Sequence, residues 1–352
     1  MNTFFDTVKN ITKNPLVSLA SEGLESADVP YWVDTGSYIV NAILSGSIFK
    51  GLPGNKVTCF AGESATGKTF FALSMCKNFL DANPEGNVIY CDTELAITQK
   101  MLTDRGIPTD RMIFLPIGII EEWGTQMAQI LDEYKKDKDK KPLLCVLDSM
   151  GGLVAKKQME NTLEGHHVAN MQDSKLLKAA LKIMTFKCGE AEVPLVITQH
   201  TYDAVGSMYA TKEIAGGKGL KYLASSIIFL GKKKEKVGTE VIGNIIHCKT
   251  YKSRFTIENR MVDTLLTYEK GLDKYYGLLD IATKYDIIKK VANRFEIDGK
   301  MFYGKEIYKD PERFFTEDLL NKIDKACEKE FSYGDGSHLI EESEVTDEEV
   351  MV

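Results

Sequence analysis

The chain has 352 residues, 43% of them hydrophobic, which suits a core domain of ordinary size with smaller additions at its ends. No apolar run approaches the ~18 residues that a membrane span requires, and the N-terminus lacks the basic flank and apolar stretch of a signal peptide. We therefore expect a soluble protein without membrane partners, located in the cytoplasm, or in the host-cell cytoplasm if a phage encodes it.

The net charge of −7 is unevenly distributed along the chain. The last 18 residues hold seven acidic residues and no lysine or arginine, whereas residues 201–260 carry eleven lysines or arginines against five acidic residues. A basic middle and an acidic end do not exclude nucleic acid as a partner. The seven cysteines are scattered and never spaced as C-x-x-C, which predicts reduced core residues rather than a disulfide frame or a zinc site.

The chain begins with an amphipathic segment, residues 1–30, whose apolar positions are Phe4, Phe5, Val8 and Ile11. Asn14-Pro15 breaks the pattern, and a connector follows up to Pro30. One interpretation is a frayed terminal helix. The other is an arm that packs on something else, because a linker separates its apolar face from the core.

The central motif is a G-x-x-x-x-G-K-[ST] phosphate loop, made of Gly62, Glu63, Ser64, Ala65, Thr66, Gly67, Lys68 and Thr69. A short apolar strand, residues 56–61, precedes it, and an apolar-periodic helix starts at residue 70. In such a loop backbone N–H groups face phosphate oxygens, the lysine reaches the β- and γ-phosphates, and the threonine hydroxyl binds Mg²⁺. The motif predicts ATP and Mg²⁺ as cofactors.

Alternating strands and helices after the loop predict a mostly parallel sheet flanked by helices, an α/β fold. Ligands in such folds sit beyond the carboxyl ends of the strands. This rule selects Asp92-Thr93-Glu94, Asp148-Ser149 and Gln199-His200 as neighbours of the phosphate loop. The expected strands are residues 56–61, 87–92, 112–115, 143–148, 194–198 and 226–230.

The strand-end residues suggest roles in phosphoryl transfer. Asp148 ends an apolar run as in a Walker B pattern and could hold Mg²⁺ together with Thr69. Glu94 could orient and deprotonate the attacking water, although a helix-start glutamate is the alternative. His200 could contact the γ-phosphate and report its loss, or be structural.

Two polar inserts follow the strand ends, residues 151–168 and 201–218. Loops of this length are usually functional, and two basic inserts beside a sensor position predict contact with a nucleic-acid backbone. A solvated lysine face is the alternative for Lys175, Lys178 and Lys182, which share one helix face. His166-His167 lacks further metal ligands and is interpreted as loop. The candidate DNA contacts are Lys156, Lys157, Lys175, Lys178, Tyr202, Tyr209, Lys212, Gly216, Gly217 and Lys218.

The C-terminal part is expected to hold antiparallel strands over residues 237–270 and then a small α+β module, residues 275–333. Its expected elements are a helix at 278–282, a hairpin around Asp298-Gly299 and a last helix at 317–330. The tail, residues 334–352, is too polar to pack and is predicted to be disordered.

The ordered motifs together resemble those of RecA-type strand-exchange recombinases, in particular the UvsX branch of tailed phages, over about residues 30–330. They are Thr35-Gly36-Ser37, residues 62–69, Asp92-Thr93-Glu94, residues 147–149, residues 197–200, Gly216-Gly217 and Lys252-Ser253-Arg254.

The resemblance implies a RecA-like P-loop ATPase core over residues 31–274, an N-terminal oligomerisation arm and a small C-terminal lobe. It further implies that Glu94 is the catalytic base, that the two inserts bind DNA, and that Lys252 and Arg254 reach the ATP of the adjacent protomer. His200 stands where bacterial RecA has glutamine. Met101 corresponds to the adenine-side position, where an aromatic residue is usual.

The expected function is a DNA-dependent ATPase that forms a helical filament on single-stranded DNA. It would pair that strand with homologous duplex DNA and exchange strands in recombination, repair and recombination-dependent replication. A single-strand-binding protein and a loading mediator are the expected assisting partners. The alternatives are a hexameric helicase motor of related fold and a regulatory ATP-binding module.

Overall fold

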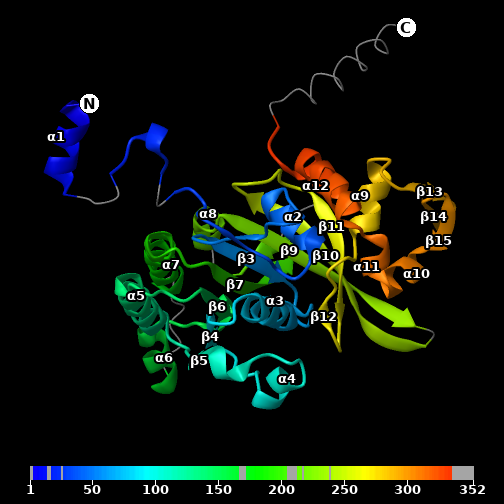
Figure 1. Ribbon diagram of the computed structural model, residues 1–352. Coiled ribbons are helices and arrows are strands. Elements are labelled where there is room, and N and C mark those ends of the chain that lie inside the picture. Colours follow the sequence, from blue (N-terminus) through cyan, green and yellow to red (C-terminus); the bar gives the residue numbers. More distant parts are fainter. Residues whose placement is uncertain are drawn as a thin grey trace, which may run out of the picture.

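Figure 1 presents the computed structural model, which describes residues 3–13, 17–24, 27–165, 172–203, 212–215, 218–237 and 239–334. Its body is a ten-stranded sheet in the spatial order β12-β11-β10-β9-β3-β7-β6-β4-β5, with β8 beside β7. The strands are β3 (Val57–Gly62), β4 (Asn87–Asp92), β5 (Met112–Pro116), β6 (Leu143–Asp148), β7 (Leu195–Asp203), β8 (Lys212–Ile214), β9 (Ser226–Val237), β10 (Glu240–Ser253), β11 (Met261–Thr267) and β12 (Gly271–Leu272).

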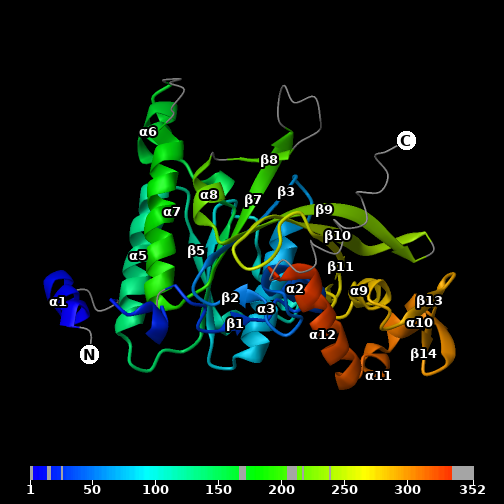
Figure 2. The same cartoon turned by 90° about the horizontal axis from the view of Figure 1, so that it is seen from above.

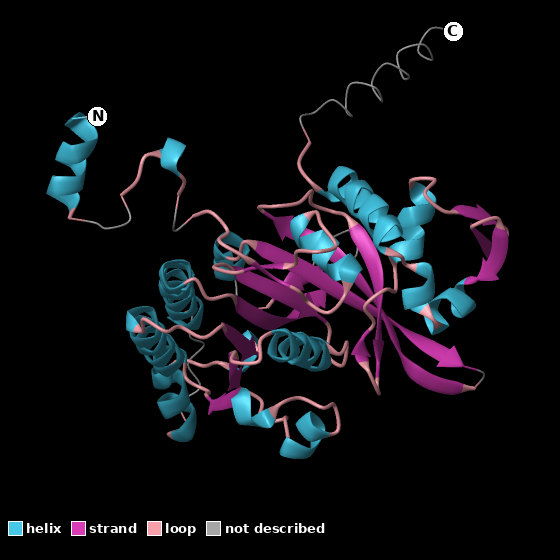
Figure 3. Cartoon of the chain, in the orientation of Figure 1, coloured by secondary structure: helices cyan, strands magenta, loops and turns pink. Residues whose placement is uncertain are grey.

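Helices cover both faces of this sheet, as the colouring in Figure 3 makes clear. One face carries α2 (Tyr38–Ser45), α3 (Lys68–Ala82) and the C-terminal helices, and the other carries α5 (Ile120–Lys136), α7 (Gln172–Ala191) and α8 (Lys218–Leu223). Side chains alternate along each strand, so Phe60 belongs to the first hydrophobic cluster and its neighbour Cys59 to the second. The predicted α/β architecture is confirmed.

The sheet has a parallel half and an antiparallel half. Strands β3, β4, β5, β6, β7 and β9 pair in parallel, and β9 also starts the antiparallel run β9-β10-β11-β12. The sequence predicted that the strand at 226 ends at residue 230, but β9 continues to Val237. Beyond Leu230 it pairs only with β10, so it is an edge strand there, and its mostly exposed side chains need no apolar alternation.

The two inserts contain more regular structure than the sequence indicated. The first holds the 3₁₀ turn Met150–Gly152 and a helix, α6 (Lys156–Leu163). In the second, β7 runs on to Asp203 and β8 pairs antiparallel with it, and α8 begins at Lys218. His166, His167, Tyr209, Gly216 and Gly217 lie outside the described residues.

The C-terminal module has the predicted order of elements. The hairpin of β14 (Arg294–Ile297) and β15 (Lys300–Tyr303) turns at Asp298-Gly299, both with positive φ as a two-residue type I′ turn requires. Around it lie α9 (Leu278–Lys284), β13 (Lys289–Val291), α10 (Gly304–Lys309), α11 (Pro311–Phe314) and α12 (Glu317–Phe331). These helices share the first hydrophobic cluster with α2 and α3, and Figure 2 shows α12 beside α2. The domain limits at residues 30, 274 and 333 stay predictions. The acidic residues of the tail, from 335 onward, lie outside the described part of the chain.

The remaining elements are short. They are α1 (Thr3–Thr12), the 3₁₀ turns Ala20–Glu22 and Thr109–Arg111, α4 (Gln99–Thr103), and the pair β1 (Trp32–Val33) and β2 (Leu52–Pro53). Helix α1 lies apart from the sheet in both views and exposes most of Phe4 and Ile11 (Figures 1 and 2). None of the helices in the described ranges has the length and apolar character to cross a membrane. All seven cysteines are free and buried, which confirms their assignment to the core.

Candidate nucleotide site

The phosphate loop connects β3 to α3 as predicted. Ala65 and Gly67 adopt positive φ values of 57° and 101°, the backbone conformation that lets the loop close tightly. The Lys68 ammonium is turned back on the loop, where Nζ donates to the carbonyls of Gly62 at 3.0 Å and Glu63 at 2.9 Å. Burial lowers the pKa of Lys68, and the nearby Asp148 and Glu94 carboxylates partly offset that effect.

Strand register brings the predicted strand ends to this loop. In the β3–β7 pair Gly62 lies opposite His200, and in the β4–β6 pair Asp92 lies opposite Asp148. Asp148 is buried and accepts hydrogen bonds from the Tyr90 hydroxyl at 2.7 Å and from the Thr198 hydroxyl. Burial, and then the adjacent Asp148 charge, raise the pKa of Tyr90 well above its usual value, so Tyr90 remains a donor that orients Asp148.

Glu94, Ser149, His200 and Lys68 form a connected group. Glu94 Oε1 accepts a hydrogen bond from Ser149 Oγ at 2.8 Å and lies 3.5 Å from His200 Nε2. The other ring nitrogen, Nδ1, lies 3.4 Å from Lys68 Nζ. The structure therefore brings together four of the residues that the sequence selected.

Lys68, Glu94 and His200 line one cavity of about 340 Å³. Its lining comes from the phosphate loop and start of α3, from the strand ends, and from the antiparallel half of the sheet: Ser64, Ala65, Gly67, Lys68, Thr69, Phe70, Glu94, Asp148, His200, Lys232, Lys234, Asn244 and Tyr268. The sequence did not indicate that residues of the antiparallel half, Lys232, Lys234, Asn244 and Tyr268, belong to this cavity. Tyr268 directly follows β11 and is 56% exposed, and its only sequence signal is an aromatic residue at a strand end.

The cavity fits a magnesium–nucleotide complex. Thr69 supplies a hydroxyl and Asp148 a carboxylate to the same wall, and oxygen ligands are those that Mg²⁺ prefers. Each Asp148 oxygen accepts one hydrogen bond and keeps a second lone pair.

Other predicted nucleotide residues lie at the margin of the cavity. Thr66 is buried and its hydroxyl donates to the Glu63 carbonyl at 2.7 Å, so it shapes the loop. The Glu63 side chain forms an ion pair with Lys212 of β8, which lowers the pKa of Glu63. Met101 lies on α4 and does not line the cavity, so its place beside the adenine stays a prediction.

The candidate DNA contacts that the structure describes are largely at the surface. Lys156 and Lys157 are exposed on α6, as are Lys175 and Lys178 on α7. Tyr202 is 48% exposed, and its hydroxyl donates to Glu213 at 3.3 Å.

Lys252 and Arg254 lie at the opposite edge of the sheet from the phosphate loop. Ser253 pairs with Ser226, which pairs with Thr58 at the start of β3, whereas the loop begins after Gly62. The Lys252 Nζ donates to the carbonyls of Lys221, Tyr222 and Ala224 at the end of α8. Orphan carbonyls at a helix C-terminus attract such a cation.

Arg254 is exposed beside two other cations at this edge. Burial, followed by the Arg254 charge, lowers the pKa values of Lys56 and Lys252. Three cations gathered in this way form an anion-attracting surface, of which Lys56 was missed because it stands just before a strand without any motif.

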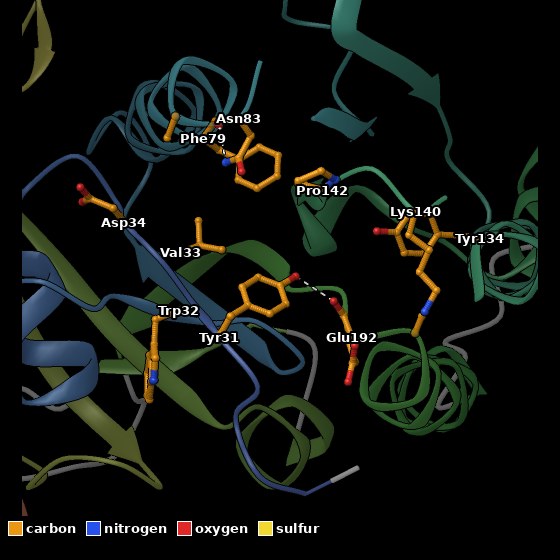
Figure 4. A pocket seen from close by; sticks show the side chains of 12 residues that line it. Tyr31, Trp32, Val33, Asp34, Phe79, Asn83, Tyr134, Lys140, Pro142 and Glu192 are labelled. Carbon is orange, nitrogen blue, oxygen red and sulfur yellow. Dashed lines mark hydrogen bonds between the residues drawn. The ribbon is translucent and has the colours of Figure 1, made fainter. Parts of the chain in front are cut away.

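A larger cavity of about 480 Å³ lies beyond the amino ends of β6 and β7 (Figure 4). Aromatic side chains line much of it, and the Tyr31 hydroxyl donates to the Glu192 carbonyl at 2.7 Å. It contains no residue of the phosphate loop or of the carboxyl strand ends. The larger cavity is therefore separate from the nucleotide site.

Comparison with known proteins agrees with this geometry. The chain is 28% identical to the recombination and repair protein of Enterobacteria phage T4 over 274 residues, which cover 78% of this chain and 68% of that protein. It is 25% identical to Protein RecA of Streptomyces rimosus over 289 residues (81% and 73%) and 28% identical to Protein RecA of Malacoplasma penetrans over 280 residues (78% and 78%). These similarities confirm the resemblance to RecA-type proteins and their phage relatives. The family model for the RecA N-terminal domain matches residues 4–273, which is most of this chain, and the chain therefore belongs to the RecA family.

Proposed function

We propose that this chain is a DNA-dependent ATPase that assembles on single-stranded DNA and carries out strand exchange in recombination and repair. The observation that carries the proposal is the convergence of Lys68, Glu94, Asp148 and His200 on one cavity at the phosphate loop of a RecA-family chain. Family membership supports strand exchange, and the relatives reported above give no support to the helicase alternative.

ATP hydrolysis would rest on residues that line the cavity or contact its lining. Lys68, Thr69 and Asp148 would hold MgATP, which supplies the phosphoryl group and the charge-neutralising metal. Glu94 would orient the attacking water and accept its proton, because its carboxylate faces the cavity. Ser149 donates to the Glu94 Oε1 atom, which fixes the carboxylate and leaves its other oxygen for water.

His200 would couple the nucleotide to DNA. It lies between Lys68 and Glu94, where a γ-phosphate would contact it, and it belongs to β7. The next residue, Thr201, pairs with Ile214 of β8, so β7 and β8 form the base of the second insert. A shift of His200 on loss of the phosphate would therefore be transmitted to the strand pair that carries this insert.

Filament formation would complete the site. The cations of the opposite sheet edge, Arg254 above all, would approach the nucleotide of a neighbouring protomer, and the N-terminal arm would pack on that neighbour. The exposed lysines of α6 and α7, together with the second insert, would hold the DNA backbone. Homologous duplex DNA, a single-strand-binding protein and a loading mediator are the proposed partners, and the cytoplasm is the proposed compartment.

The test is a comparison of Lys68→Ala with Lys77→Ala. Lys77 lies on the same helix and pairs with Asp81 at the surface, so its loss leaves the cavity intact. We expect DNA-stimulated ATPase activity and ATP-dependent filaments in the electron microscope for the unmodified protein and for Lys77→Ala, and neither for Lys68→Ala. Equal ATPase activity of the two variants, or closed rings instead of filaments on single-stranded DNA, would reject the proposed function.

A further inference from the structure

The phosphate loop faces a second set of cations from its own chain. Lys232 and Lys234 of β9 line the nucleotide cavity, and the Lys232 ammonium donates to the Ala65 carbonyl at the tip of the loop. An ammonium has three N–H donors, and among the described residues the Ala65 carbonyl is the one acceptor found for it. The other N–H groups of the Lys232 ammonium can therefore donate to a ligand at the edge of the cavity.

Strand geometry explains why these two lysines point to the loop and the lysine between them does not. Side chains alternate along β9, and Ile228 and Leu230 belong to the hydrophobic cluster on the α3 face. Lys232 and Lys234 continue that face beyond the core, whereas Lys233 continues the opposite face and does not line the cavity. Asn244, which pairs with Lys234 in register, extends the same wall on β10.

The charge balance of the cavity indicates what these lysines do. Without Lys232 and Lys234, the cavity lining would hold one lysine, Lys68, against two carboxylates, those of Glu94 and Asp148. A site of net negative charge repels a polyphosphate. With Lys232 and Lys234, three lysines face two carboxylates and the balance becomes positive. Both added lysines are exposed, so placing their charge at the mouth costs little desolvation.

We propose that Lys232 and Lys234 are phosphate-binding residues that contact the ATP polyphosphate in cis, in addition to Lys68 and to the cations of a neighbouring protomer. The proposal rests on the proposed function, because it assigns ligand contacts to the same cavity. It predicts that their contribution grows with the number of phosphates on the nucleotide and is absent for the base and sugar.

The experiment measures equilibrium binding of fluorescent ATP, ADP and AMP analogues, with Mg²⁺, to the DNA-free full-length chain. The variants are Lys232→Gln and Lys234→Gln, with Lys233→Gln as the matched control from the opposite face. Glutamine keeps an N–H donor for the Ala65 carbonyl and removes only the charge. Each cavity-facing variant should weaken ATP binding about 10-fold, the effect of losing a hydrogen bond to a charged group. AMP affinity should stay unchanged, and Lys232→Arg should restore ATP affinity.

Each other outcome has a distinct meaning. If Lys232→Gln and Lys234→Gln bind ATP as well as Lys233→Gln does, the lysines do not contact phosphate and the inference is wrong. If ATP and AMP weaken equally, Lys232 only supports the shape of the loop, and the inference is also wrong. Absence of ATP binding in the unmodified chain would instead refute the nucleotide site itself.

Discussion

Replacing Arg254 by alanine tests whether the far edge of the sheet acts on a neighbouring protomer. The strand register places Ser253 level with Thr58, at the start of β3. The phosphate loop follows the other end of β3 at Gly62, four residues or about 13 Å further along the strand. Arg254 follows Ser253 and so lies still further from the nucleotide cavity of its own chain. The Arg254 backbone N–H donates to the Ser225 carbonyl at 3.0 Å, a bond that alanine retains. Arg254→Ala is thus a cleaner variant than Lys252→Ala, which would also uncap α8.

We expect Arg254→Ala to lower the filament ATPase about 10³-fold, as for an arginine supplied in trans, with ATP affinity of the dilute protomer unchanged. Mixing provides the decisive assay, with Glu94→Gln as the partner variant. In an equimolar mixed filament about a quarter of the boundaries join an intact Glu94 to an intact Arg254, so about a quarter of the unmodified rate should return. Mixed filaments that are visible by labelling but show no recovered hydrolysis would refute action across the boundary, as would an unchanged rate for Arg254→Ala alone.

Three further predictions concern other parts of the chain. Glu94→Gln should retain ATP binding while single-turnover hydrolysis falls by about 10² or more, because it removes the base and keeps the shape; an unmodified rate would show that Glu94 is not the base. Tyr268→Ala should weaken ATP, ADP and adenosine alike whereas Tyr268→Phe should not, as measured by calorimetry, if the exposed ring stacks on the base; equal affinities of the two variants would exclude stacking. Truncation after Tyr333 removes seven carboxylates that compete with DNA phosphates for basic residues, so duplex-DNA affinity should rise most at low salt. Identical salt titrations of truncated and full-length protein would leave the acidic tail only a role in solubility.

The parallel half of the sheet could be predicted from the sequence because its strands are continuous apolar runs followed by a polar strand end. The motif at residues 62–69 and the carboxyl-end rule together located Glu94, Asp148 and His200 at one site, and the register pairs Gly62 with His200. The turn at Asp298-Gly299 could also be predicted, because few residues other than glycine tolerate the positive φ of its second position.

What the sequence did not indicate depends on contacts between distant segments. Residues 231–237 have too many lysines to resemble a strand, and they become one only because β10 pairs with them. Helix α6 has no buried side chain, and its two large apolar residues, Met159 and Leu163, are too few to predict a helix from periodicity. The helix-capping contacts of Lys252 and the position of Tyr268 at the cavity likewise arise only when the antiparallel strands fold against the parallel ones.

The two hydrophobic clusters have a consequence for synthesis on the ribosome. The buried members of the cluster around α5 and α7 all lie between residues 57 and 227, whereas those of the cluster around α2 and α3 span residues 33 to 331. One face of the sheet can therefore be covered early, but on the other face the side of α2 that contacts α12 is covered only after α12, the last helix of the described residues, has been translated. Until then the nascent chain lacks part of the cover of α2, whose apolar side chains are buried once folding is complete. A ribosome stalled before residue 317 would thus hold a chain in which α2 is only partly covered, and this intermediate is the one that chaperones would need to protect.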